Sequence, residues 1–104
     1  MTSPRSGATL TSVNVTVRYW ASARAVAGCD SERLGVPTGG SPVGGHHAGI
    51  VNVGDALAAA AAAHTGLSVV LDVSTILLDG RAVTASEPLT EGATIEVLPP
   101  FAGG

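Results

Sequence analysis

The segment that most constrains the fold is an alternating run that stops at a proline pair. Thr94 to Leu98 alternates polar and apolar side chains, the period of a β-strand with one buried face. Proline has no amide hydrogen for the ladder, so Pro99-Pro100 ends the strand and starts an extended segment. Glycine has no Cβ, so the Gly-Gly end at Gly104 fits a tunnel too narrow for side chains. We therefore predict an extended C-terminal tail at residues 99–104 that leaves a folded domain at the end of a strand.

A second alternating run predicts a strand near the N-terminus. Apolar side chains recur at every second position from Val13 to Tyr19, whereas residues 1–12 read as a disordered leader. Small residues from Ser22 to Ala27 favour a helix of one or two turns, which Gly28 can close. Ser31 to Val36 predicts a weaker strand, and its short separation from the first strand favours antiparallel pairing.

The middle of the chain combines a loop with an alanine-rich helix. Two prolines and two Gly-Gly pairs predict a flexible loop insertion at 37–49. Alanine propensity and an acid in the first turn favour a helix from Asp55 to His64, with Asn52 or Gly54 as its cap. Leu57 is its one large apolar side chain, so we expect this helix to approach a sheet closely through small residues.

Three more strand signals follow the helix. Val69 to Val73 is compatible with a short turn or strand, and the dense apolar run from Thr75 to Leu78 predicts a central strand. Asp79-Gly80 is a two-residue hairpin signal that returns the chain into a short strand at 81–83. With the final strand, the order is β, β, long helix, β, β, β.

This order of elements resembles the β-grasp fold of ubiquitin. The resemblance implies an α+β domain over residues 13–98, with a mixed sheet of four to five strands and one main helix across one face. The first and last strands would pair in parallel at the sheet centre, which suits their apolar alternation. The free C-terminal Gly-Gly tail would then leave from a rigid platform.

The composition excludes several classes of function. Charged residues are 12% of the 104 residues, the net charge is −3, and all five basic residues are arginine. Such sparse positive charge argues against a nucleic-acid partner, and the absence of lysine removes Schiff-base chemistry. The apolar run from Ala56 to Ala63 is far too short for a membrane span. A lone Cys29 and the lack of a signal-peptide pattern favour a cytoplasmic protein.

Metal and nucleophile chemistry find little support in the sequence. His46-His47 and His64 could bind a metal in principle, but adjacent histidines point apart and no cysteine or carboxylate lies at ligand spacing. Cys29 beside a glycine turn is more typical of a small structural residue than of a nucleophile. We therefore predict no metal site and no catalytic group within the domain.

Several motifs together resemble the MoaD and ThiS family of ubiquitin-like sulfur carriers, most closely the small-subunit branch of molybdopterin synthase. The last motif is the most specific, because a turn, a strand, a proline pair and Gly-Gly follow in that order and spacing. Two features depart from the family pattern: Ala25 follows Arg24 where glutamate is common, and the 37–49 loop replaces a short connection. The motifs that carry the resemblance are Val15–Ala21 with Arg24, Val53–Leu57, Leu78–Val83 and Pro88–Gly104.

The resemblance implies that Gly104 is the reacting group. An E1-like adenylyltransferase of the MoeB type would adenylate its carboxylate with ATP, and a sulfur donor protein would convert it into a thiocarboxylate. The tail would enter a MoaE-like large subunit, which holds the catalytic residues and passes the sulfur to the pterin precursor of the molybdenum cofactor. Two such heterodimers would pair through their large subunits, and the chain itself would bind no cofactor tightly. Insertion would involve Pro100, Phe101, Ala102 and Gly103, and docking would involve Trp20, Arg24 and Leu98.

Three alternatives remain open on the sequence. The chain could carry sulfur for thiamine or cysteine biosynthesis, although the proline pair favours the molybdopterin branch. It could be a ubiquitin-like modifier that is conjugated to target lysines through Gly104. It could also be a plain β-grasp binding module with an inert tail.

Overall fold

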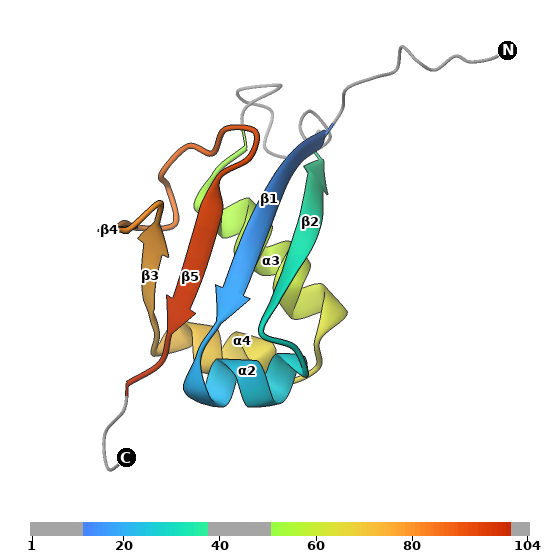
Figure 1. Cartoon of the computed structure of the whole chain (residues 1–104), viewed down its shortest axis with the longest axis vertical. Helices are drawn as coiled ribbons and strands as arrows, with labels where there is room; N and C mark the ends of the chain where they lie inside the picture. The colour runs from blue at the N-terminus through green and yellow to red at the C-terminus, as the bar shows by residue number, and fades with distance from the viewer. Residues whose placement is uncertain (1–11, 38–50, 101–104) are drawn as a thin grey trace, which may run out of the picture.

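The computed structural model describes residues 12–37 and 51–100 (Figure 1). Residues 1–11 of the predicted leader, residues 38–49 of the predicted loop, and Phe101 to Gly104 of the tail lie outside the described residues. None of the helices in the described segments is both long and apolar enough to cross a membrane.

Five strands form one mixed sheet in the order β2-β1-β5-β3-β4. The strands span Ser12–Tyr19 (β1), Ser31–Pro37 (β2), Thr75–Leu78 (β3), Arg81–Ala82 (β4) and Thr94–Leu98 (β5). β1 pairs with β5 in parallel, and the other three pairs are antiparallel. The predicted α+β fold, with its first and last strands paired at the sheet centre, is confirmed.

The central strands bury the apolar half of their alternation. Val15, Val17 and Tyr19 of β1 point into the core, each no more than 2% exposed. Ile95 and Val97 of β5 are fully buried beside them, because the parallel register pairs Val17 with Ile95 and Tyr19 with Val97. The polar alternate positions of both strands therefore share the opposite face of the sheet.

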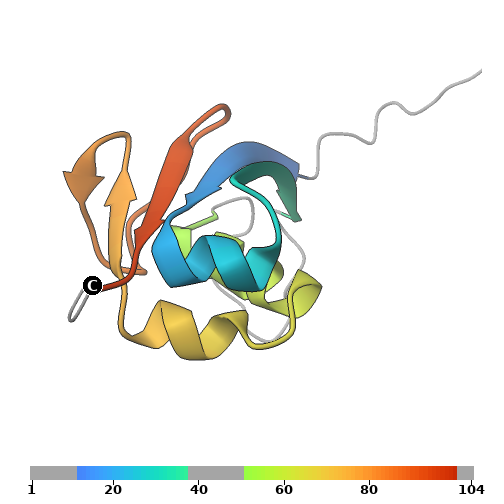
Figure 2. The ribbon, with the colours of Figure 1, turned by 60° about the horizontal axis from the view of Figure 1, so that its bottom comes forward.

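Three helices cover one face and one end of the sheet. α3 (Val53–Ala63) crosses the inner face, and α2 (Ala21–Ala27) and α4 (Leu67–Asp72) lie side by side at the end where β1 and β5 finish (Figures 1 and 2). Ala56 and Ala60 of α3 are fully buried, whereas Leu57 is only partly buried. Close packing through small residues, as the sequence predicts, thus holds α3 against the sheet.

The capping box at the start of α3 settles which of the two predicted caps is used. The Asn52 side chain accepts a hydrogen bond from the Asp55 amide at 2.9 Å, and the Asp55 carboxylate accepts one from the Asn52 amide at 2.9 Å. The Asp55 amide also donates to the Asn52 carbonyl at 3.0 Å, and the Asp55 carboxylate satisfies the Asn52 amide. Asn52 is therefore the N-cap.

The substitution Asn52→Ala is expected to lower the free energy of unfolding by about 1 kcal/mol, because one end of the capping box is lost. Urea denaturation of the two proteins measures the difference. Ser68→Ala, at an exposed position of α4, is the control and should change stability by less than about 0.5 kcal/mol. Equal stability of wild type and Asn52→Ala would contradict the role of the box.

One expectation for the segment after α3 is wrong. Residues 69–73 lie not in a turn or strand but mostly in α4, which buries Leu67 and partly buries Val70 and Leu71 at helical spacing. Val69 and Val73 face solvent, being 71% and 64% exposed. The β-branched run was misleading because tertiary packing overrides a weak local preference.

β3 is an interior strand, as predicted, because it pairs with β5 on one side and with the two-residue β4 on the other. Leu78 is the one buried residue of its four. The predicted hairpin that follows is confirmed, because Asp79 and Gly80 both adopt positive φ, at 49° and 90°.

Candidate functional site

The root of the tail is fixed by the middle of the sheet. β5 ends at Leu98, its neighbours are β1 and β3, and Pro99 directly after it is buried while Pro100 is exposed. The amide of Trp20 donates a hydrogen bond to the carbonyl of Val97 at 3.3 Å, which extends the parallel ladder to the strand end. The chain therefore leaves the domain from a strand that is hydrogen-bonded on both sides.

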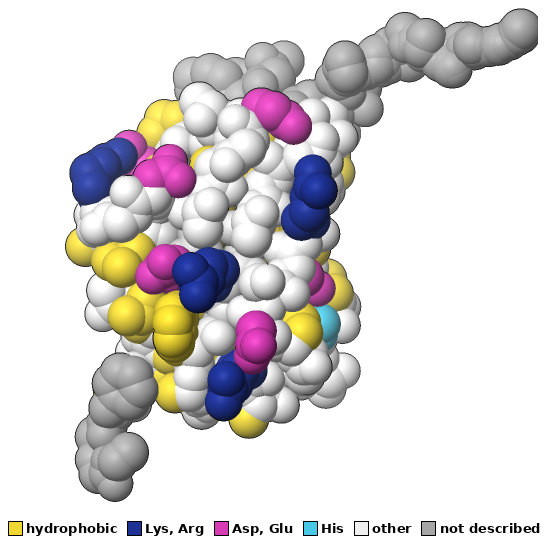
Figure 3. Space-filling view, viewed as in Figure 1, with side chains coloured by type: hydrophobic (Ala, Val, Ile, Leu, Met, Phe, Trp, Pro, Cys, Tyr) yellow, Lys and Arg dark blue, Asp and Glu magenta, His cyan; other side chains and the backbone are white. Residues whose placement is uncertain are grey.

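Two of the predicted docking residues lie beside this root. Trp20 is 40% exposed, and Leu98 is partly buried at the last position of β5. Arg18 pairs with Glu96 in the parallel register, so the next outward positions of the two strands are Trp20 and Leu98. Hydrophobic side chains gather on this face next to the end of the described chain (Figure 3).

Arg18 is a member of this surface that the sequence analysis missed. Its guanidinium carbon lies 5.1 Å from the centre of the Trp20 ring, and its Nη1 lies 3.9 Å from Oε2 of Glu96. A cation over an indole face is worth about 0.5–1 kcal/mol at an exposed site. Arg18 thus restrains the Trp20 ring. The sequence could have indicated this contact, because residues two positions apart along an extended strand lie on the same face.

Arg24, the third predicted docking residue, has a local partner. It lies in α2 one turn after Trp20, and its Nη1 is 3.3 Å from Oδ1 of Asp30. Both side chains are mostly exposed, at 61% and 81%, so this ion pair contributes little to stability. Arg24 remains open to solvent, and its role in docking stays a prediction.

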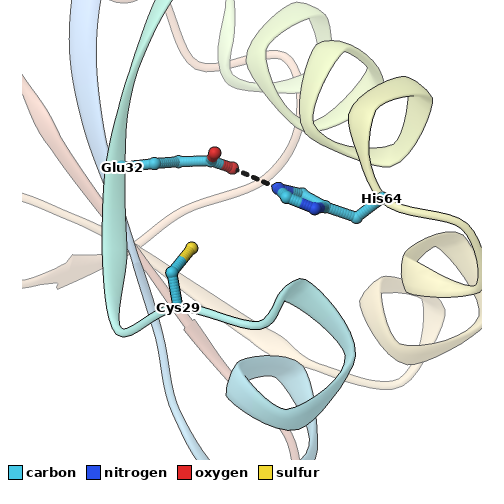
Figure 4. A group of neighbouring side chains, drawn as sticks. All are labelled: Cys29, Glu32 and His64. Carbon is cyan, nitrogen blue, oxygen red and sulfur yellow. Dashed lines mark hydrogen bonds and ion pairs between the residues drawn. The ribbon is translucent and has the colours of Figure 1, made fainter.

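A separate polar cluster lies between β2 and the end of α3 (Figure 4). Oε2 of Glu32 accepts a hydrogen bond from the Tyr19 hydroxyl at 2.5 Å and lies 2.7 Å from Nε2 of His64. The ring of Tyr19 also meets the His64 ring edge-to-face, with centroids 6.0 Å apart. Cys29 points toward the same space.

The electrostatics of this cluster follow from burial and negative charge. Burial, the hydrogen bond to Glu32 and the charge of Glu32 all raise the pKa of the Tyr19 hydroxyl. Burial, and then the charges of Glu32 and Asp30, raise the pKa of the Cys29 thiol. Cys29 is therefore protonated and poorly nucleophilic in this state, in agreement with its predicted structural role.

The fold overturns one expectation about metal ligands. The sequence suggested that His64 has no cysteine or carboxylate at ligand spacing, yet Cys29 and Glu32 each place a donor atom within 4.8 Å of it and of each other. Sequence reasoning missed this group because the three residues come from separate elements that only the folded sheet brings together. His46 and His47 lie outside the described residues.

Comparisons with known proteins agree with this fold. The family model described as the ThiS family matches residues 17–104. The small archaeal modifier protein 1 of Haloferax volcanii is 27% identical with a TM-score of 0.68, covering 88% of this chain and 99% of that one. A candidate molybdopterin converting factor subunit 1 from Pyrococcus furiosus is also 27% identical with a TM-score of 0.68, covering 86% and 99%. No curated protein sequence gives a significant match.

A third structure supports the fold alone. The small archaeal modifier protein 1 of Methanosarcina acetivorans is 21% identical with a TM-score of 0.67, and the match covers 89% of this chain and 98% of that one. The chain thus spans nearly the full length of all three proteins.

Proposed function

Since the chain belongs to the ThiS family of ubiquitin-like sulfur carriers and modifiers, we propose that it is the sulfur-carrying small subunit of a molybdopterin synthase. The observation that carries the proposal is the fixed root of the tail. β5 is hydrogen-bonded to β1 and β3 and ends directly before the proline pair, so the position of the tail's base is set by the core. A tail of this kind presents one reactive group, the carboxylate of Gly104, to partner enzymes.

The chemistry at Gly104 requires activation by other proteins. A carboxylate is a poor electrophile because it is anionic and would have to expel oxide or hydroxide. Attack of the Gly104 carboxylate on ATP would give an acyl adenylate and release pyrophosphate. The persulfide of a sulfur donor protein would then displace AMP to form an acyl disulfide, and a second thiol would cleave the S–S bond to leave a thiocarboxylate at Gly104. An E1-like adenylyltransferase of the MoeB type is the proposed activating partner.

Reach and slenderness are what the tail supplies to this chemistry. Six extended residues from Pro99 to Gly104 span at most about 20 Å, at roughly 3.3–3.6 Å per residue. Pro100, Phe101, Ala102 and Gly103 would lie inside the MoaE-like large subunit, whose catalytic residues use the sulfur. This length allows a buried active site to be reached while the folded domain stays outside.

Docking would use the outer face of the sheet beside the tail. Trp20 and Leu98 offer apolar area there, Arg18 holds the indole ring, and Arg24 adds an exposed positive charge. Aromatic and arginine side chains of this kind are the usual anchors of protein interfaces. The proposed setting is a cytoplasmic complex in which the large subunits pair two heterodimers.

A ubiquitin-like modifier is the second candidate function. The similarity to small archaeal modifier protein 1 favours it, because that protein matches as well as the molybdopterin converting factor does. The chain has no lysine, so it could be attached to other proteins but could not form chains through its own side chains. Sulfur delivery for thiamine or cysteine biosynthesis remains a variant of the first proposal.

Intact-mass analysis after co-expression with the activating enzyme and sulfur donor tests the carrier function. We expect a mass increase equal to the replacement of one oxygen by sulfur at Gly104. Omission of the sulfur donor is the control and should leave the carboxylate unmodified. An unmodified chain despite a competent sulfur supply would contradict the carrier function.

Copurification with partners separates the candidate functions. Recovery of a molybdopterin synthase large subunit supports the first proposal. Recovery of a thiazole or cysteine synthase would support sulfur delivery for thiamine or cysteine biosynthesis instead. Covalent adducts on lysines of other proteins would support the modifier function.

A further inference from the structure

Cys29, Glu32 and His64 form the one group of three metal-ligand side chains in the described part of the chain. Cys29 lies in the turn after α2, Glu32 lies on β2, and His64 is the C-cap of α3. A thiol sulfur, a carboxylate oxygen and an imidazole nitrogen lie within 4.8 Å of one another (Figure 4). We propose that these side chains bind one Zn²⁺ ion, with solvent as the fourth ligand.

The donor set selects the class of metal. Thiolate sulfur and imidazole nitrogen suit Zn²⁺ and similar transition metals, whereas Mg²⁺ and Ca²⁺ prefer oxygen ligands alone. Three protein ligands with one open position form a common tetrahedral zinc arrangement. Hydrogen bonds explain why the side chains of Tyr19, Glu32 and His64 lie together. They do not explain why the Cys29 thiol also points toward Glu32 and His64.

The spacing needs only small side-chain adjustments. Around a tetrahedral Zn²⁺ ion, these donor atoms would lie about 3.4–3.6 Å apart, given the usual zinc–ligand distances. The contact between Glu32 and His64 is 2.7 Å, so it must open by less than about 1 Å, and the thiol must move inward by up to about 1.4 Å. The side chains of Glu32 and His64 are 23% and 18% exposed, which leaves a path for an ion from solvent.

Zinc binding would rearrange the protons of the cluster. If Nε2 of His64 is the ligand atom, it must offer its lone pair, so the neutral ring must carry its proton on Nδ1, and the contact with Glu32 is replaced by one bond from each residue to zinc. The Cys29 thiol releases its proton to solvent and binds as thiolate. One thiolate and one carboxylate then balance the charge of the ion.

Neighbouring residues already orient the ligands. The Tyr19 hydroxyl donates to Oε2 of Glu32, and this tyrosine is 2% exposed, so the carboxylate is held by a rigid core residue. Asp30, the nearby acid, is engaged by Arg24. A bound ion would thus link α2, β2 and α3, and would stabilise the folded chain against unfolding.

Zinc titration of the full-length, metal-free chain under reducing conditions tests the proposal. In competition with a chromophoric chelator, we expect one equivalent of Zn²⁺ to bind in the micromolar range or tighter. Co²⁺ should give a thiolate-to-metal charge-transfer band. Cys29→Ser and His64→Gln should each weaken Zn²⁺ binding at least about tenfold, because each removes a direct ligand.

The matched control is the double substitution His46→Gln with His47→Gln, because these are the other two imidazoles of the chain and could compete for zinc. It should leave affinity and the Co²⁺ band unchanged. Zinc should also raise the thermal midpoint of the wild type but not that of Cys29→Ser. If Cys29→Ser does not fold, the Co²⁺ charge-transfer band of the wild type alone tests whether the thiolate binds the metal. Absence of that band, or zinc binding lost only with His46 and His47, would overturn the proposal.

Discussion

Deletion of Gly104 is expected to abolish sulfur transfer, and so is addition of one residue after it, while the fold stays intact. Each change shifts the terminal carboxylate by about 3.3–3.6 Å relative to a root that the sheet holds fixed. A misplacement of about 1 Å can already cost a factor of 100 in rate, so activity should fall at least about 100-fold. Thiocarboxylate formation by intact mass and product formation in a molybdopterin synthase assay measure the two steps.

The control for this prediction is a one-residue extension at the N-terminal end, which changes the length of the chain but not the reach of the tail. It should transfer sulfur like the wild type, and all three proteins should melt at the same temperature. Retained synthase activity in the chain without Gly104 would show that the terminal carboxylate does not carry the sulfur.

Val17→Ala is expected to lower the free energy of unfolding by about 2–4 kcal/mol, because it removes a fully buried side chain and leaves a cavity. Val17 lies on β1 opposite Ile95 of β5, at the centre of the core. A domain of this kind has a total stability of only about 5–15 kcal/mol. Urea denaturation of the two proteins gives the difference.

The matched control is the same substitution at Val69, which is 71% exposed on α4. Val69→Ala should change stability by less than about 0.5 kcal/mol, or raise it slightly because alanine favours the helix. Equal losses at the two positions would mean that the β1–β5 pair is not the main source of stability.

Local signals explain which parts of the fold could be predicted from the sequence. The strands β1 and β5 follow from their period of two, and the hairpin follows from Asp79-Gly80, because each signal lies within a few residues. The helix at Leu67 could not be predicted in this way. Its register is set by burial of Leu67 against the core, and its exposed valines imitate a strand.

The same distinction applies to the candidate functional surfaces. The tail and Trp20 could be named as candidates from the sequence, because the first is a motif and the second follows an alternating strand. The meeting of Cys29, Glu32 and His64 could not, because it depends on how β2 approaches the end of α3.

The parallel pairing of β1 with β5 also links folding to completion of synthesis. β5 follows every other strand in the chain, yet it lies between β1 and β3. The sheet therefore has a high contact order, and its two halves cannot join until Thr94 to Leu98 has left the ribosome. A chain that terminates before Thr94 lacks both the Gly-Gly end and the strand that joins the halves. Under the proposed function, such a truncated chain would offer partner enzymes neither a folded platform nor a reactive end.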